Sequence, residues 1–340
     1  MNILVVGAGA VGQVYGRHLA LGGTKVSFFV REKYAEEIRR GLVFYPLNRS
    51  RPRVAPVRLE LAADQVLTSL DEVAKQTWDA VILTMASPAL RGDFLPSLAA
   101  VVGDATLVSL QPGSEDRGFM LAAFAEERVV AGMITVVSYQ APLPGETVPE
   151  PGMAYWFPPM APAPFSGPPE RTRAIVDALK KGGLPSKVGV DVPSSVMFPS
   201  VVLMTMLTAL ESVGWRFAEL GRADNLKKVH AAATEAFAIM GSASQRRAPL
   251  TLRLAVRPFW LRTILAVARW VMPLDLEAYM KFHFTKVRAQ TRLHMQSFID
   301  QGAKVHYPTN ALIALEAGLA RLALAGGDCV APAGSLPERK

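Results

Sequence analysis

Six residues near the start of the chain have the spacing of a phosphate-binding turn. The apolar residues 2–6 are followed directly by Gly7-Ala8-Gly9-Ala10-Val11-Gly12, and a helix-like stretch comes next. In this pattern the first glycine permits a tight turn, the second lets backbone approach a pyrophosphate, and the third lets the helix pack on the strand. The amides and dipole of the helix N-terminus then favour an anion. The motif predicts a dinucleotide site; the alternative is a glycine-rich turn kept for packing.

A second strand-like run, residues 25–30, ends in basic residues. An enzyme that selects NAD places Asp or Glu at this strand end, where it bonds the ribose hydroxyls. This chain has Arg31 there, nineteen residues after Gly12, with Lys33 close behind. A guanidinium pairs with a phosphate through two hydrogen bonds and stacks on adenine. Arg31 and Lys33 therefore favour NADP(H) over NAD(H). The acidic Glu32 between them is a counter-signal. The alternative is that both bases are ordinary solvated surface residues.

Residues 109–116, SLQPGSED, form a polar corner at the end of another apolar run. The carboxyl ends of parallel strands face the ligand crevice of an open α/β sheet. We therefore assign Gln111 and Pro112 to the cofactor pocket, together with Thr84 and Met85 at the end of the preceding apolar run. Gln111 is expected either to donate a hydrogen bond to the carboxamide or substrate, or to cap the following helix. Pro112 lacks a backbone donor.

The order of the expected elements divides the chain into two domains and a tail. Strand-like runs at residues 2–6, 25–30, 80–84, 105–110 and 128–140 alternate with helix-like stretches. This alternation predicts an α/β fold with an N-terminal Rossmann-type doubly wound sheet. Residues 141–170, rich in Pro and Gly around MAYWF, predict an antiparallel edge with irregular loops. We expect a nucleotide-binding domain at 1–191, an all-helical domain at 192–326 and a flexible tail at 327–340.

Composition excludes several classes of protein. The one cysteine, Cys329, allows neither a disulfide within the chain nor a zinc site of thiolates, and no metal site is predicted. The N-terminus lacks the basic start of a signal peptide, so we expect a cytoplasmic protein. The net charge is +8, but the bases are scattered without a run of five or six. We expect a small-molecule substrate and no nucleic-acid partner.

Two apolar stretches raise the question of a membrane. Residues 192–210 hold no charge over a length that nearly spans a bilayer, but Pro193 and Pro199 shorten the helical part. A buried core helix is the preferred interpretation. Residues 250–273 carry four arginines among Leu, Phe and Trp: Arg253, Arg257, Arg262 and Arg269. Such a segment either lies on a membrane surface or caps an apolar pocket, and the pocket is preferred.

The glycine motif, Arg31, the LQ-x-G corner at 110–113 and the helical second half together resemble the ketopantoate reductase family. The resemblance implies a 6-phosphogluconate-dehydrogenase-like architecture, in which a Rossmann domain precedes a helical domain and NADPH and substrate bind in the cleft between them. It also implies a monomer or a homodimer.

The chain departs from the family pattern where the keto acid is held. The lysine expected after residues 80–84 is missing from Thr84-Met85-Ala86, and the asparagine of the LQNG motif has become Pro112. Residues 197–203 lack the lysine and asparagine of the family's first interdomain helix. A carboxylate without a cationic partner loses charge-assisted hydrogen bonds of about 1.5–3 kcal/mol each. Ketopantoate is therefore not the expected substrate.

Residues 281–294 concentrate titratable groups in the helical half. His283 and Lys286 are three residues apart and share a helical face. We predict that one of them protonates the carbonyl oxygen as hydride arrives from NADPH; the alternative is a solvated amphipathic helix. The other polar candidates are Glu211, Ser212, Ser138 and Tyr139.

Apolar side chains occupy many of the vacated positions, among them Met85, Met197, Phe198, Leu203, Met204 and Met206. They indicate either an adaptable apolar wall or ordinary core packing. We predict an NADPH-dependent oxidoreductase that reduces a carbonyl in a substrate more apolar than ketopantoate. The alternatives are an imine reductase or opine-type dehydrogenase, with Arg292 as the carboxylate-binding residue, and a non-catalytic NADP(H)-binding sensor.

Overall fold

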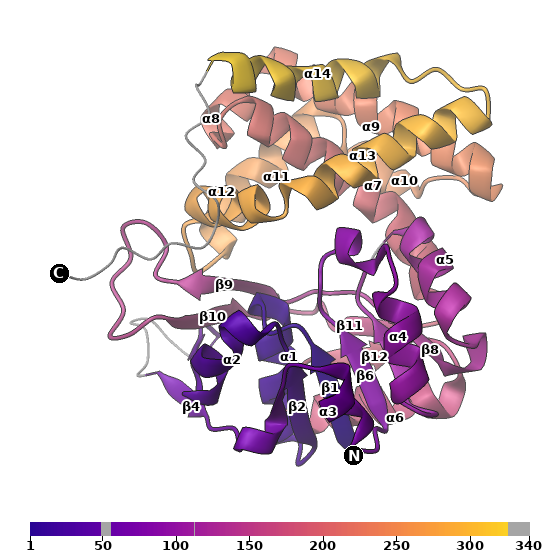
Figure 1. Cartoon of the computed structure of the whole chain (residues 1–340). Coiled ribbons are helices and arrows are strands. Elements are labelled where there is room, and N and C mark those ends of the chain that lie inside the picture. The colour runs from indigo at the N-terminus through magenta and orange to yellow at the C-terminus, as the bar shows by residue number, and fades with distance from the viewer. Residues whose placement is uncertain (49–55, 112, 326–340) are drawn as a thin grey trace. The chain divides into compact units, whose positions relative to one another are not determined.

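A computed structural model describes residues 1–48, 56–111 and 113–325 (Figure 1). The chain divides into two compact units, Met1–Met197 and Phe198–Lys340. The division falls inside helix α7 (Val192–Ser212), whereas the sequence places the boundary just before residue 192. The expected tail at 327–340 lies outside the described residues.

The first unit is built on an eight-stranded sheet in the order β12-β11-β8-β7-β6-β1-β2-β5 (Figure 1). Its strands are β1 (Asn2–Val6), β2 (Lys25–Phe29), β5 (Val66–Leu67), β6 (Ala80–Leu83), β7 (Thr106–Ser109), β8 (Val129–Gly132), β11 (Ala163–Ser166) and β12 (Ser186–Val188). Six neighbouring strands, in the spatial order β5-β2-β1-β6-β7-β8, pair in parallel. Strand β11 is antiparallel to β8. The chain runs outward from β1 to β2 and then returns to β6 on the other side of β1. Ligands of such sheets bind at the strand ends where the order reverses.

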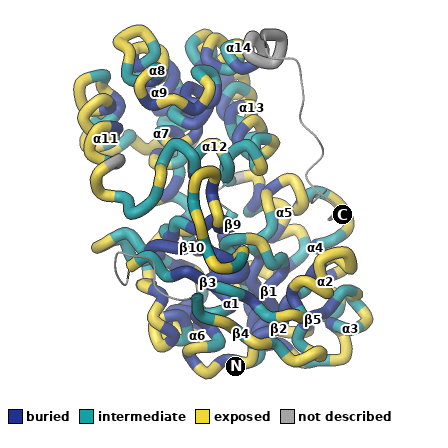
Figure 2. Tube along the Cα trace, turned by 90° about the vertical axis from the view of Figure 1, so that its left-hand side faces the viewer, coloured by how far each residue is buried: buried dark blue, intermediate teal, exposed yellow. Residues whose placement is uncertain are grey.

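Helices and short 3-10 turns connect these strands. They are α1 (Ala10–Leu21), α2 (Glu32–Arg39), α3 (Leu70–Ala74), α4 (Phe94–Val101), α5 (Ser114–Ala123), α6 (Pro169–Lys181), η1 (Ala63–Gln65), η2 (Ser87–Leu90) and η3 (Glu126–Arg128). Alternate residues of β1 enter two apolar clusters: Ile3 packs with Val14 of α1, and Leu4 packs with Leu98 of α4. Figure 2 shows β1 as buried. Burial on both faces explains why β1 is a continuous apolar run. The predicted Rossmann-type sheet is confirmed.

A second sheet of four strands, in the order β4-β3-β10-β9, extends the first unit. Its members are β3 (Leu42–Pro46), β4 (Val57–Leu59), β9 (Val137–Ala141) and β10 (Gly152–Trp156). The prediction of one strand over residues 128–140 is wrong, because this run supplies β8 to the first sheet and β9 to the second. A continuous apolar pattern carries no mark of the point where a chain leaves one sheet for another. The MAYWF run forms β10, which is antiparallel to β9 as predicted but also pairs in parallel with β3, so it is an interior strand and not an edge.

The described elements of the second unit are helical. They are the rest of α7, then α8 (Phe217–Leu220), α9 (Ala223–Ser244), α10 (Leu250–Ala255), α11 (Pro258–Val271), α12 (Leu276–Lys286), α13 (Arg288–Lys304) and α14 (Asn310–Ala325). Helix α9 is central and contacts α11, α13 and α14. Helix α7 is long and apolar enough to cross a membrane, but half of its apolar stretch is buried in the structure. Leu207 and Leu210 are almost fully buried, as the core-helix interpretation requires.

Candidate functional site

The glycine turn connects β1 to α1 at the reversal of the sheet. Gly7 has a φ of +99°, which residues with a side chain rarely adopt, and its N–H donates to the Phe29 carbonyl at 2.9 Å. A Cβ atom on Gly12 would lie 2.2 Å from the Gly7 carbonyl oxygen and 2.6 Å from the Thr84 hydroxyl oxygen. These two glycines are therefore required by the packing of the protein itself.

Gly9 differs from its two neighbours in the motif. A Cβ atom at Gly9 would meet nothing within 4 Å. The residue caps α1 with extended backbone and has no side chain to accept from the first amides of the helix, and no such side-chain bond is seen among the described residues. Such amides favour an anion that lies against the helix N-terminus. The open space and the uncapped helix N-terminus fit a pyrophosphate that presses against the backbone.

Thr84, at the end of β6, holds the glycine turn. Its hydroxyl oxygen lies 2.9 Å from both the Val6 and the Gly7 carbonyl oxygens, so it donates to this pair from the neighbouring strand. Met85, the next residue, is half-buried and packs against the cluster that contains Leu98. Both residues thus lie beside the turn, where the sequence places them.

Gln111, at the end of β7, ties two strand ends together. Its side-chain Nε2 donates to the Met85 carbonyl at 2.7 Å and to the Leu83 carbonyl at 3.2 Å. Its Oε1 accepts from the Leu110 N–H and from the Ser109 hydroxyl, both at 3.1 Å. The amide thus positions the ends of β6 and β7 and does not reach toward a ligand. The alternative of a helix cap is wrong, because α5 has no side-chain cap. Pro112 lies outside the described residues.

Changing Gln111 to alanine should lower the free energy of unfolding by about 1–3 kcal/mol, because buried carbonyl groups lose their donors. Urea denaturation measures the loss. Gln296→Ala, at an exposed position on α13 where the side chain bonds only Asp300 within the described residues, should change stability by less than about 0.5 kcal/mol. Equal stability of Gln111→Ala and the wild type would contradict the positioning role.

The loop after β6 is also joined to the segment after β7 by a second set of hydrogen bonds, which sequence reasoning missed. The carboxylate of Asp116, in the first turn of α5, is almost fully buried. It accepts from the Ser87 hydroxyl at 2.6 Å and from the Arg91 guanidinium at 3.4 Å. An acid in a helix's first turn is a known stabilising pattern, but nothing local indicates its partners. The loop after β6 is therefore fixed to α5.

Arg31 and Lys33 lie at the start of α2, directly after β2. The Arg31 guanidinium lies 5.2 Å from the centre of the Tyr34 ring and donates to the Tyr34 hydroxyl at 3.4 Å. The Lys33 ammonium lies 4.9 Å from the same ring. All three side chains are exposed. Tyr34 was missed by sequence reasoning, although its spacing of three from Arg31 places the two on one helical face.

His283 and Lys286 lie on α12 of the helical unit. The His283 ring stacks on Tyr279, with 5.4 Å between ring centres, and meets Phe284 edge-on. Burial, and secondarily the Lys286 ammonium, lower the pKa of His283 to about 4. Lys286 is exposed, its ammonium lies 3.7 Å from the centre of the Phe282 ring, and partial desolvation lowers the pKa of Lys286. At neutral pH His283 is therefore uncharged.

Three of the remaining polar candidates are engaged within the protein. Glu211 pairs with Arg288 of α13, and the Ser212 hydroxyl donates to the Ala209 carbonyl. Tyr139 donates to Glu146 at 3.0 Å, and Ser138 is buried on the same strand. Arg292 is exposed on α13. Among the described residues, no group of three or more His, Cys, Asp or Glu side chains could hold a metal ion.

Two members of the expected apolar wall belong to the core of the helical unit. Phe198 and Met204 are almost fully buried, and the Phe198 ring packs edge-on against Phe237 of α9. For these two residues the core-packing alternative holds. Leu203 is 44% exposed.

A doubly wound sheet with a glycine turn at its reversal, followed by a helical unit, defines a Rossmann-type protein with an all-helical C-terminal domain. Residues 3–159 match the family model of ketopantoate reductase PanE/ApbA. Over these residues, a little under half of the chain, it is similar to the ketopantoate reductase PanE/ApbA family. No curated protein sequence matches the chain.

Three solved structures share the fold over nearly their whole length. D-mandelate dehydrogenase with NADH and anilino(oxo)acetate has a TM-score of 0.73 at 15% identity, covering 94% of this chain and 97% of that one. The ketopantoate reductase from Ralstonia eutropha JMP134 has a TM-score of 0.71 at 18% identity, covering 95% and 98%. The 2-dehydropantoate 2-reductase from Geobacter metallireducens GS-15 has a TM-score of 0.68 at 17% identity, covering 95% and 100%. At these identities the likeness establishes the fold alone.

Proposed function

We propose that this protein is an NADP(H)-dependent oxidoreductase that reduces the carbonyl group of a small molecule more apolar than ketopantoate. The observation that carries the proposal is the open space beside Gly9, at the uncapped N-terminus of α1. Backbone amides there would bind the pyrophosphate of the dinucleotide. A reduced nicotinamide bound in this way supplies the hydride, and the protein's own task is to hold the dinucleotide and to deliver a proton.

Preference for NADP(H) is supported by the start of α2. Arg31 stands where an NAD-selective protein has an acid, and Lys33 adds a second positive charge on the same tyrosine ring. A guanidinium and an aromatic ring together suit a phosphate beside an adenine. The D-mandelate dehydrogenase structures contain NADH, so the family fold itself does not dictate the choice.

Changing Arg31 to alanine should weaken NADPH binding about 10–100-fold, because a charge-assisted hydrogen bond contributes about 1.5–3 kcal/mol. NADH has no phosphate at this position, so its affinity should fall much less than that of NADPH, by the loss of adenine stacking alone. Isothermal calorimetry with both dinucleotides measures the difference. Arg40→Ala, at the exposed end of the same helix, is the matched control. Equal loss for NADPH and NADH, or no loss at all, would refute the role of Arg31.

The substrate class follows from the side chains beside the glycine turn. Thr84 bonds backbone carbonyls, Met85 is apolar, and Gln111 is committed to the strand ends. None of these three offers a cation to a carboxylate, which supports a ketone or aldehyde without an adjacent acid group. NADPH absorbance followed against aldehydes, ketones, keto acids and imines tests this. We extend the proposal to a cytoplasmic monomer or homodimer, with Lys286 as the proton donor.

A second candidate function is an NADP(H)-binding sensor without turnover. The commitment of Gln111 to backbone groups and the neutral state of His283 favour it, because one expected ligand-binding group and one expected proton donor are then unavailable. Tight NADPH binding without oxidation of any compound in the panel would identify the sensor. NADPH oxidation with one class of carbonyl compound would identify the reductase.

A further inference from the structure

The outer face of α11 exposes large apolar side chains to solvent. Leu261 and Leu265 are buried on the opposite face, and α11 contacts α9. The exposed residues are Phe259, Trp260, Ile264, Val267, Trp270 and Val271. We call these six residues the α11 face. Phe259 is 71% and Trp270 84% exposed, and Figure 2 shows exposed residues along much of this helix.

The spacing of the α11 face makes it a continuous stripe. The six residues recur at intervals that place them on one side of a helix: Phe259, Val267 and Trp270 follow one row, and Trp260, Ile264 and Val271 follow the row beside it. The exposed side of a helix in a soluble protein is normally polar, and a contiguous apolar patch marks an interaction site. For residues 250–273 the sequence alone favours a segment that caps an apolar pocket over one that lies on a membrane surface. The exposure of Trp270 supports the surface alternative instead.

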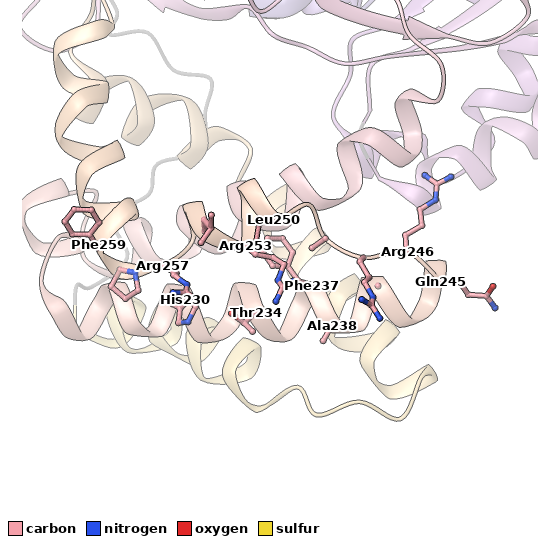
Figure 3. A pocket seen from close by; sticks show the side chains of 15 residues that line it. His230, Thr234, Phe237, Ala238, Gln245, Arg246, Leu250, Arg253, Arg257 and Phe259 are labelled. Atoms are coloured by element: carbon pink, nitrogen blue, oxygen red, sulfur yellow. The ribbon is translucent and has the colours of Figure 1, made fainter.

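The surroundings of the α11 face are strongly basic. Residues 236–274 contain six arginines and no Asp or Glu, against a net charge of +8 for the whole chain. A groove of about 1130 Å³ adjoins the face, because Phe259 also lines it (Figure 3). The groove lies between α9 and residues 245–259, and its lining includes Arg246, Arg253 and Arg257 but no acidic residue. The arginine-lined groove and the α11 face therefore meet at Phe259.

We propose that α10 and α11 dock this protein on the surface of an anionic membrane. Trp260 and Trp270 would enter the boundary between headgroups and acyl chains, and the nearby arginines would pair with lipid phosphates. The 14 residues of α11 are too few to span a bilayer, so the helix would lie in the plane of the interface. A second copy of the chain fits this surface less well, because a twofold contact would bring its arginines together. The proposal is independent of the proposed function.

Sedimentation of the full chain with lipid vesicles tests the proposal. Binding is expected to vesicles that mix phosphatidylglycerol with phosphatidylcholine, and to be at least tenfold weaker to phosphatidylcholine alone. Raising the salt from about 0.1 to 1 M should release much of the protein, since the screening length falls from about 10 to 3 Å. Inorganic phosphate should release no more than sodium chloride of equal ionic strength, because a membrane and not a free anion is the ligand. Absence of binding to the anionic vesicles at low salt would overturn the proposal.

Tryptophan fluorescence reports the same event residue by residue. Trp78, Trp156 and Trp215 are buried, whereas Trp260 and Trp270 are exposed. Anionic vesicles should shift the emission to shorter wavelength, and lipids brominated on their acyl chains should quench it. The double variant Trp260→Phe with Trp270→Phe should still bind vesicles but lose both signals. An unchanged spectrum for the wild type in the presence of vesicles would contradict insertion of the α11 face.

Charge and apolar variants separate docking from self-association. Arg253→Gln and Arg257→Gln should each weaken vesicle binding about fivefold. Trp270→Ser should weaken it at least tenfold, and the exposed controls Arg173→Gln on α6 and Ile313→Ser on α14 should not change it. Light scattering without lipid gives the oligomeric state. A dimer that Trp270→Ser converts to a monomer, together with no vesicle binding by the wild type, would assign the surface to a second copy and refute membrane docking.

Discussion

Replacing Gly12 with alanine is expected to abolish detectable NADPH binding and to destabilise the first unit. The added methyl group would lie 2.2 Å from the Gly7 carbonyl oxygen. The backbone at Gly7 and the backbone at Gly12 can move apart only if the whole turn changes its conformation. Overpacking of this kind costs about 1–3 kcal/mol of folding free energy. Calorimetry with NADPH and urea denaturation measure the two effects. Wild-type affinity in Gly12→Ala would contradict the assignment of this turn to the dinucleotide.

Gly9→Ala is the matched control, because it adds the same methyl group at another glycine of the same turn. Nothing in the protein lies within 4 Å of the added atom, and the backbone of Gly9 suits alanine. The free energy of unfolding should therefore stay the same or rise by up to about 1 kcal/mol. The methyl group would nevertheless occupy the space for the pyrophosphate, so NADPH affinity should fall at least tenfold. Unchanged affinity would mean that no ligand approaches this backbone.

Replacing Lys286 with alanine is expected to lower turnover about 10²–10⁴-fold and to leave NADPH binding unchanged, because a general acid contributes to the chemical step. Desolvation brings the pKa of Lys286 below the usual 10.5 of lysine. Turnover should therefore fall as the pH rises through that lowered pKa. Steady-state kinetics with the compound that the panel identifies measures both effects. Lys281→Ala, an exposed lysine of the same helix, should retain full activity.

His283→Ala should affect turnover much less than Lys286→Ala does. With a pKa of about 4, His283 holds no extra proton at neutral pH, so its removal should cost far less turnover than the removal of Lys286. The pH profile should show no inflection near 6.5, the ordinary pKa of histidine. Normal turnover in Lys286→Ala together with a large loss in His283→Ala would reverse the assignment.

Local features of the first unit could be predicted from the sequence. The strand before Gly7, the glycine turn and the basic start of α2 each depend on a few adjacent residues, and the structure places them together at the sheet reversal. The second sheet was not predictable in the same way. Strand β3 pairs with β10, more than a hundred residues later, and β4 is only three residues long. No local period carries such a pairing.

In the candidate site, too, contacts between residues far apart in the chain could not be predicted from local sequence patterns. Gln111 stands at the expected strand end, but its partners, the Leu83 and Met85 carbonyls, come from another loop. Asp116 likewise finds Ser87 through the fold and not through spacing. The amphipathic pattern of residues 250–273 was visible in the sequence. Which side of α11 faces solvent depends on its packing against α9, so the exposure of Trp270 needed the structure.

A calorimetric titration of the full chain with NADPH and with NADH, under identical conditions, shows whether the protein binds a dinucleotide and which one it prefers. NADPH should bind at least tenfold more tightly than NADH, because Arg31 and Lys33 present two cations at the end of β2. No heat of binding with either dinucleotide up to about 1 mM, equivalent to a binding free energy weaker than about −4 kcal/mol, would contradict it.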